Sequence, residues 1–158
     1  LLDQNITKNN ISNTKIIAKA VSDKVGTVKF YVNPNSSGDN SLVEKTNHVE
    51  KVQTTTIDLL AKKFGTPNII KVDVEGAERK VIEGMKKTIK NKKLKAIFME
   101  ITPSKIDEKV SIGSQLQKAG FAVSIMLEKE EKIVAFTKES FQKEVKTHAY
   151  ANIMAIRK

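Results

Sequence analysis

The spacing of hydrophobic and polar residues along this chain switches repeatedly between a helical and a strand period. Apolar positions three or four residues apart predict helices at residues 1–10, 57–64, 77–89, 112–119 and 137–145. Short apolar or alternating runs predict strands at residues 16–21, 27–32, 50–55, 69–74, 96–99, 121–127, 133–136 and 151–156. Strands separated by helices indicate an α/β fold with a mostly parallel sheet, and the closely spaced last strands indicate an antiparallel edge. No repeat or linker divides the chain, so we expect residues 1–158 to form one domain.

The composition is that of a globular protein. Apolar residues make up 39% of the chain and charged residues 29%, which excludes intrinsic disorder. No apolar run approaches the roughly 18 residues that a membrane-spanning helix needs, and no signal peptide is recognisable. The chain has no cysteine, which excludes disulfides, thiolate nucleophiles and cysteine-based zinc sites. A cytoplasmic protein without membrane contact is the default expectation.

The net charge of +10 comes almost wholly from lysine, because only Arg79 and Arg157 among the 28 basic residues are arginines. Proteins that read nucleic acids mostly use arginine forks and stack bases on aromatic rings. Aromatic residues are only 5% of this chain, and tryptophan is absent. We therefore expect a solvated lysine-rich surface rather than a nucleic-acid site, and such a surface is compatible with attraction of anionic substrates.

Two acidic residues end predicted buried strands. Asp73 closes the strand at 69–74, and Glu100 follows the strand at 96–99. Ligands of open α/β sheets bind outside the carboxyl ends of the strands, so the two carboxylates face one crevice if their strands are neighbours. There they can act as a general base, accept a hydrogen bond from a cofactor amine or bind a divalent ion. A charge at the end of an apolar run is costly unless it is used, which favours a functional role for Asp73.

The other titratable residues point less clearly to chemistry. Glu75 lies four residues before Arg79, so a solvated helix pair is an equal alternative to a functional role. Glu78 shares a face with apolar helix positions, which indicates a partly buried carboxylate that needs a partner. His48 and His148 lie far apart in polar surroundings without metal-ligand spacing, and we expect both at the surface. Glycine-rich phosphate loops and a serine nucleophile elbow are absent from the sequence.

Several segments, in their order along the chain, resemble the FkbM methyltransferase family. They are the asparagine-rich residues 2–9, Ala20-Val21-Ser22-Asp23 with the strand that follows, and residues 52–58, 70–78 and 81–84. Together they cover about residues 1–101, and the segment around Asp73 is the most specific. Beyond Ile101 the likeness is only architectural.

The resemblance implies a Rossmann-like class I methyltransferase fold. Such enzymes transfer a methyl group from S-adenosylmethionine, usually to a hydroxyl oxygen of a sugar, a polyketide or another small product. The expected partner is therefore a small-molecule or glycan acceptor. By position in the family, Ala20, Val21 and Ser22 would touch the adenine, and Ser41 would lie on a loop lining the same pocket. Asp73 would lie near the methionine end of the cofactor and near the acceptor.

The resemblance also suggests roles for the two acids. Methyl transfer needs in-line placement of acceptor and methyl group, so positioning supplies much of the acceleration. A carboxylate can take the proton of the acceptor hydroxyl, with Asp73 as the first candidate and Glu100 as the second. No distinct motif supports a metal site.

One departure from the family concerns the cofactor. The acidic-glycine turn after the family's first strand and the acidic residue after its second strand have no counterpart here. We therefore expect the first two strands to be missing and the strands at 16–21 and 69–74 to have exposed edges. A chain of this kind is expected to bind S-adenosylmethionine poorly, to be inactive alone and to self-associate or repack. Tight S-adenosylmethionine binding in calorimetry would contradict the first of these expectations.

Two other functions compete with O-methylation. The chain can be a non-catalytic remnant that serves as an interaction module, which the missing cofactor turn favours. It can also be an RNA-binding or RNA-methylating domain, which the +10 charge favours. A glycine-turn strand encoded directly upstream would favour the enzyme over the module, and salt-dependent RNA affinity would test the third hypothesis.

Overall fold

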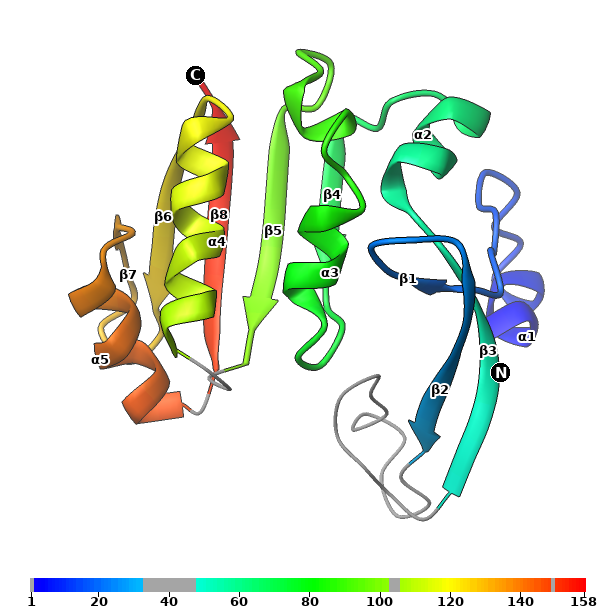
Figure 1. Cartoon of the computed structure of the whole chain (residues 1–158), viewed down its shortest axis with the longest axis horizontal. Helices are drawn as coiled ribbons and strands as arrows, with labels where there is room; N and C mark the ends of the chain where they lie inside the picture. Colours follow the sequence, from blue (N-terminus) through cyan, green and yellow to red (C-terminus); the bar gives the residue numbers. More distant parts are fainter. Residues whose placement is uncertain (1, 33–47, 103–105, 149) are drawn as a thin grey trace.

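The computed structural model describes residues 2–32, 48–102, 106–148 and 150–158. The elements in chain order (Figure 1) are α1 (Leu2–Lys8), β1 (Ala20–Val21), β2 (Gly26–Val32), β3 (His48–Thr55), α2 (Ile57–Phe64), β4 (Ile69–Val72), α3 (Glu78–Glu83), the 3₁₀ turn η1 (Thr88–Lys90), β5 (Ala96–Ile101), α4 (Ile106–Lys118), β6 (Phe121–Leu127), β7 (Lys132–Ala135), α5 (Lys138–His148) and β8 (Ala151–Arg157). Within the described stretches, no helix has the length and apolar character needed to cross a bilayer.

The larger of two sheets has five strands in the order β4-β5-β8-β6-β7. β4 and β5 are parallel and are joined through α3 and η1. β8 lies between β5 and β6 and is antiparallel to both, and β7 pairs with β6 as an antiparallel hairpin. This sheet therefore begins as a parallel crossover and ends as an antiparallel edge.

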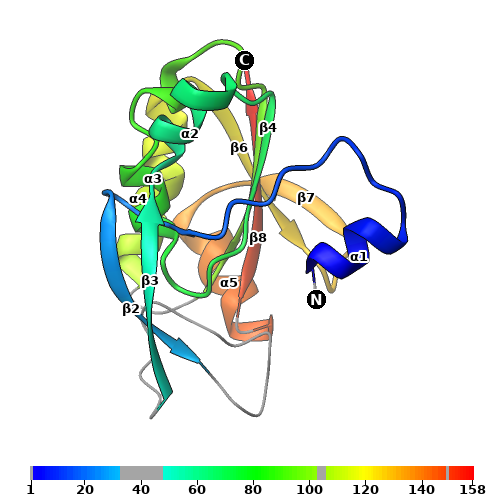
Figure 2. The same cartoon turned by 90° about the vertical axis from the view of Figure 1, so that its right-hand side faces the viewer.

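One face of the five-stranded sheet packs against helices. Figures 1 and 2 show α3 and α4 side by side on this face, with the strands behind them. Alternate strand residues point into this layer, as period-2 patterning requires. The largest side chains that are fully buried there include Phe121, Phe141, Met85, Leu94 and Ile97. Each such side chain contributes about 1.5–3 kcal/mol when it leaves water, so this layer is the core of the molecule.

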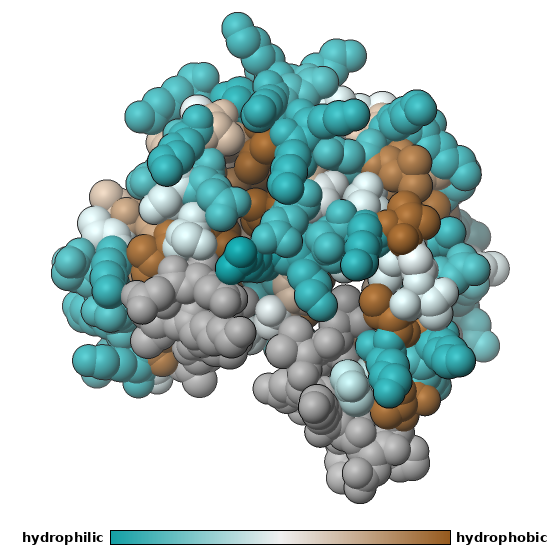
Figure 3. Space-filling view, viewed as in Figure 1, coloured by the Kyte–Doolittle hydropathy of each residue, from teal (hydrophilic) through white to brown (hydrophobic). Residues whose placement is uncertain are grey.

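The opposite face of the sheet is more open. Ile69 is 61% exposed and Ile133 is 59% exposed, and they lie on the two outer strands. On the helix-covered side, the outer surface is mostly hydrophilic, as Figure 3 shows. The two sides of the sheet thus differ in character, and the open side is where its side chains can meet a ligand.

The second sheet has three strands in the order β1-β3-β2. β2 and β3 form an antiparallel ladder, and β1 adds two residues parallel to β3. α2 then begins after Thr56, whose hydroxyl accepts the Leu59 N–H at 3.1 Å as an N-cap.

The two sheets meet at the C-terminal end of α3. The Ser22 carbonyl lies so close to Gly84 that a Cβ there would be 2.1 Å from its oxygen. The Asp58 N–H donates to the Gly84 carbonyl at 3.0 Å. The Asp58 carboxylate then accepts the backbone N–H groups of Lys87 and Thr88 and the Thr88 hydroxyl, at 2.7–3.1 Å. The start of α2 is thereby fastened to the segment that follows α3.

The predicted α/β class and the antiparallel C-terminal edge are confirmed, but the mostly parallel sheet is wrong. Within the described residues only β1–β3 and β4–β5 are parallel, and the other four pairings are antiparallel. Antiparallel partners need only a tight turn, as in β6–β7, whereas parallel partners need a crossover. The predicted strand at 16–21 shortens to β1, and the predicted helix at 77–89 is broken at Gly84 into α3 and η1.

Substituting Gly84 tests the contact between the sheets. The φ of Gly84 is −81°, so alanine fits the backbone conformation but its Cβ collides with the Ser22 carbonyl. We expect Gly84→Ala to lower the free energy of unfolding by about 1–3 kcal/mol, measured by urea denaturation. Gly26→Ala is the matched control, because its nearest atom, Thr54 Oγ1, would be 3.9 Å away. Equal losses in the two variants would contradict the close approach.

Acid titration tests the Asp58 contacts. Burial raises the pKa of Asp58, but the Lys87 and Thr88 donors outweigh it and hold the pKa below the ordinary 3.8. Because the folded-state pKa is depressed, this stabilisation is present above about pH 4 and is lost as the pH falls through the folded value. We expect Asp58→Asn to cost about 1–2 kcal/mol at pH 7 and progressively less below pH 4.

The control for that titration is Asp3→Asn, an exposed carboxylate in α1. Urea denaturation at a series of pH values should give nearly superimposable curves for this variant and the unmodified chain. If Asp58→Asn showed the same stability difference at pH 7 and at pH 2.5, the negative charge of Asp58 would not be what holds α2 against the segment after α3.

Candidate active site

Three carboxylates gather at one end of the five-stranded sheet. Asp73 follows β4, Glu75 lies in the turn after it, and Glu100 lies in β5. Each offers a carboxylate oxygen, and these oxygens all lie within 4.8 Å of one another. β4 and β5 are parallel neighbours, so the expectation that Asp73 and Glu100 face one crevice is confirmed. The two acids lie close together because the carboxyl ends of adjacent parallel strands lie side by side.

Asp73 is accessible at the rim of this crevice. Its side chain is 53% exposed, and its Oδ2 forms an ion pair with Lys71 Nζ at 3.2 Å. Within the described part of the chain, the other oxygen, Oδ1, makes no hydrogen bond. An exposed pair of this kind adds little stability, so its main effect is to orient the carboxylate.

The turn between β4 and α3 is held by a buried acid. Glu75 and Gly76 both have positive φ, 42° and 95°, which bends the chain sharply after Asp73. Glu78 is completely buried, and its Oε1 accepts the Gly76 N–H at 2.9 Å and the Thr102 hydroxyl at 3.4 Å. The prediction of a buried Glu78 with a partner is confirmed. Its carboxylate connects the end of β4 to the end of β5.

Arg79 Nε forms an ion pair along α3 with Glu83 Oε1 at 3.0 Å. Glu75 lies before α3 rather than on it. A pair between Glu75 and Arg79 would therefore not lie within one helix, as the sequence pattern assumed. The Glu75 carboxylate lies in the acidic group with Asp73 and Glu100.

The other side of the crevice comes from β6 and β8. Asn152 is paired in register with Glu100. Asn152 Nδ2 donates to Glu128 Oε1 at 2.8 Å, and the Tyr150 hydroxyl donates to Glu128 Oε2 at 3.0 Å. The Glu128 carboxylate raises the pKa of Tyr150 through this hydrogen bond. The Glu128 N–H in turn donates to the buried Glu144.

These residues were not predicted from the sequence. Glu128 directly follows β6, so the rule that selected Asp73 and Glu100, a carboxylate at the end of a buried strand, selects it as well. Tyr150 and Asn152 carry no comparable signal, because their position depends on β8 entering between β5 and β6.

A hollow of about 330 Å³ lies beside the acids on the open side of the sheet. It is lined by Lys71, Phe98, Met99, Met126, Asn152 and Ile153. Lys71 is the partner of Asp73, and Asn152 is the partner of Glu128. Phe98 precedes Glu100 by two residues and therefore lies on the same face of β5. The site thus combines a largely apolar floor with a carboxylate rim.

The residues expected at the adenine lie at the other end of α3 from these acids. Ala20 and Val21 are half-buried, and Ser22 is 2% exposed with its hydroxyl donated to Asp23 at 2.9 Å. Ser22 contacts Gly84 after α3, whereas Asp73 precedes α3, and this six-residue helix is roughly 9 Å long. The structure therefore brings Asp73 and Glu100 together but separates them from the Ala20–Ser22 turn. Ser41 lies outside the described residues.

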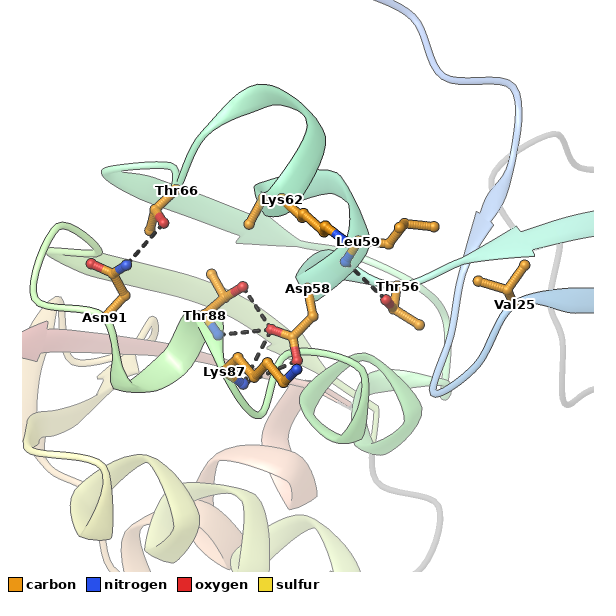
Figure 4. A pocket seen from close by; sticks show the side chains of 10 residues that line it. Val25, Thr56, Asp58, Leu59, Lys62, Thr66, Lys87, Thr88 and Asn91 are labelled. Carbon is orange, nitrogen blue, oxygen red and sulfur yellow. Dashed lines mark hydrogen bonds between the residues drawn. The ribbon is translucent and has the colours of Figure 1, made fainter.

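A larger hollow, of about 570 Å³, lies at the other end of the strands (Figure 4). Thr66 and Asn91, which line it, precede β4 and β5 respectively. Figure 4 shows Asp58 directed at Thr88 and the Lys87 backbone rather than at the open space. Ligands of α/β sheets bind at the carboxyl ends of strands, so this hollow is the weaker candidate.

His148 is more enclosed than the sequence indicated. Its side chain is 26% exposed, and its Nε2 lies 3.7 Å from Glu144 Oε1 without a hydrogen-bond partner among the described residues. The Tyr150 ring lies beside the His148 ring, with the two ring centres 6.1 Å apart. The side chain of His48 lies outside the described residues.

The chemistry open to the acidic crevice follows from its donor set. Asp73, Glu75 and Glu100 can accept a proton or attract a cationic group, and their hard oxygens would also suit a divalent ion. No histidine joins this group among the described residues.

A family model described as the methyltransferase FkbM domain matches residues 2–129. The match continues past Ile101 through α4 and β6. It therefore extends beyond residues 1–101, where the resemblance was recognised from motifs in the sequence. No curated protein and no solved structure matches the chain. Because the family model covers well over half of its length, the chain belongs to the FkbM methyltransferase family.

Proposed function

We propose that this methyltransferase moves a methyl group from S-adenosylmethionine to a hydroxyl oxygen of a small molecule or glycan, with Asp73 as general base. The observation that carries the proposal is the meeting of Asp73 and Glu100 within 4.8 Å at the carboxyl ends of neighbouring parallel strands. Ligand sites of α/β sheets lie at this edge, and the apolar hollow beside the acids gives an acceptor a surface to rest on.

The donor set of the crevice fits the cofactor's methionine end. S-adenosylmethionine supplies an electrophilic methyl group on a sulfonium when it is bound, and it also carries an ammonium group. Asp73, Glu75 and Glu100 present three carboxylates together, which attract such cations. Ala20 and Val21 would take the adenine, and their half-buried apolar side chains are suited to a flat ring. That end of the cofactor would lie toward the Ser22–Gly84 contact.

Asp73 is well placed to take the acceptor's proton. Lys71 holds Oδ2, so Oδ1 is the atom that would receive the proton from the hydroxyl. Glu100, which is half-buried beside it, is the second candidate for this role. Phe98 and Met126 line the floor and would exclude water from the acceptor oxygen. Positioning by these side chains would supply much of the acceleration.

We further propose that the catalytic unit has the Rossmann-like class I methyltransferase fold. Two features support it. β4, α3 and β5 form a parallel crossover with acids at its carboxyl ends, and β8 runs antiparallel between β5 and β6.

Replacing the proposed base tests this mechanism. Asp73→Asn keeps the shape of the side chain but cannot accept a proton, and we expect the rate of methyl transfer to fall about 10²–10³-fold. The measurement, made on the protein as its gene encodes it, is transfer of label from methyl-labelled S-adenosylmethionine to a panel of sugars, alcohols, amines and thiols. Glu100→Gln should cause a smaller loss.

The control is Glu50→Gln, an exposed carboxylate in β3 that should leave the rate unchanged. An Asp73→Asn variant that is folded and keeps a tenth or more of the rate would contradict the role of Asp73. Methylation of the amines or thiols in the panel with none of the hydroxyl compounds would instead contradict O-methylation.

A further inference from the structure

A second hollow, of about 260 Å³, lies on the helix side of the molecule between the α3–η1 segment and α4. Its floor is apolar and is made by Ile82, Ile89 and Ala119. Figure 3 shows apolar surface between hydrophilic side chains where α4 faces α3. We call this hollow the lysine groove, after the three lysines described next.

Lys86, Lys90 and Lys118 line the groove around its apolar floor. All three side chains are exposed, and none forms an ion pair with any described carboxylate. Three unneutralised cations around an apolar floor complement a ligand that carries negative charge next to an apolar group.

Arg157 makes the groove rigid from below. Its guanidinium donates to the carbonyls of Ile89 at 2.6 Å, Leu94 at 2.7 Å and Ala119 at 3.1 Å, and it stacks 4.1 Å from the centre of the Phe121 ring. Ile89 belongs to one wall of the groove and Ala119 to the other. The Arg157 guanidinium therefore fixes the distance between the two walls. A groove that is already ordered loses less conformational entropy when a ligand binds.

We propose that the lysine groove binds an acidic segment of a partner protein. An apolar side chain of that segment, flanked by the segment's own carboxylates, enters the groove. The volume is smaller than the roughly 300–1,000 Å³ of small-molecule sites and suits one or two side chains. The carboxylates of the segment pair with Lys86, Lys90 and Lys118, and the inserted side chain covers Ile82 and Ile89.

The same observations favour a protein over a nucleic acid. Stacking platforms for bases use aromatic rings or arginine planes, and the described residues that line the groove include neither. The nearby guanidinium of Arg157 is occupied by three carbonyls. The groove is also separate from the acidic crevice, because Lys86 and Lys90 follow α3 whereas Asp73 precedes it. Docking here does not depend on the proposed methyl transfer.

The probe for this proposal is a fluorescein-labelled peptide in which leucines, spaced three or four residues apart, are surrounded by glutamates. Fluorescence anisotropy with the whole chain at low salt should show micromolar binding that weakens as salt rises. The same peptide with serine in place of leucine should bind at least fivefold more weakly.

The triple variant Lys86→Glu/Lys90→Glu/Lys118→Glu should lower affinity for the leucine peptide at least tenfold. The charge-matched control changes Lys51, Lys132 and Lys146, which are exposed on other elements, to glutamate and should lower it less than twofold. Ala119→Leu leaves the charge unchanged but fills the groove, and it should also weaken binding. Circular dichroism confirms that each variant is folded.

Three results would overturn the proposal. Equal losses in the groove and control triple variants would show that only net charge matters. Equal binding of the leucine and serine peptides would show that no side chain enters the groove. A single-stranded RNA that binds more tightly than the peptide and loses affinity in the groove variant alone would assign the groove to nucleic acid.

Discussion

The arrangement of the candidate active site depends on the buried carboxylate of Glu78. A carboxylate removed from water needs hydrogen-bond donors, and leaving it without them would cost several kcal/mol, on the order of 3–5 kcal/mol for a broken buried pair. Glu78 obtains donors from the Gly76 N–H and the Thr102 hydroxyl, which lie beyond the ends of β4 and β5. The hydrogen bonds to the Glu78 carboxylate therefore fix the turn that carries Glu75. They also hold the end of β4 near Asp73 against the end of β5 near Glu100. Asp73 can stay 53% exposed because the acid that holds the turn after it, Glu78, is buried and hydrogen-bonded.

The residues of this site that follow from a local sequence pattern could be predicted from the sequence alone. Asp73 and Glu100 were found because each ends a buried strand, and the helix between the strands made a parallel crossover the natural connection. Glu128 carries the same local signal after β6 and could have been found by the same rule. Tyr150 and Asn152 could not, because they reach the crevice only when β8 inserts between β5 and β6. Strand order is set by packing across the whole sheet, and no short window of residues encodes it.

Two further differences between expectation and structure have steric causes. The pattern from residue 77 to 89 is continuous in its apolar spacing, yet the helix stops at Gly84. Its carbonyl accepts the Asp58 N–H, and the N–H groups of Lys87 and Thr88 donate to the Asp58 carboxylate, so these groups are not used to continue the helix. The Ser22 carbonyl, more than sixty residues away in sequence, also packs against Gly84, and periodicity cannot register either contact. The Ser22–Gly84 contact places the Ala20–Ser22 turn at the far end of α3 from Asp73. A cofactor that touched both groups would have to extend along α3, and the elongated shape of S-adenosylmethionine, with a cationic end and a flat apolar end, is consistent with that division.

The molecule also separates charge along its strands. The acids gather at the carboxyl ends of β4, β5 and β6, while the lysine groove lies where α3 and α4 finish, toward the amino ends of β4 and β5. The two sites lie at opposite ends of α3, which is roughly 9 Å long, and at 0.1 M salt solvent-exposed charges more than about 10 Å apart are largely screened from each other. A cation in the crevice and an acidic segment in the groove would therefore bind without strong electrostatic coupling. Any coupling between them would have to pass mechanically through α3, whose two ends are fixed by Glu78 and by the contact at Gly84.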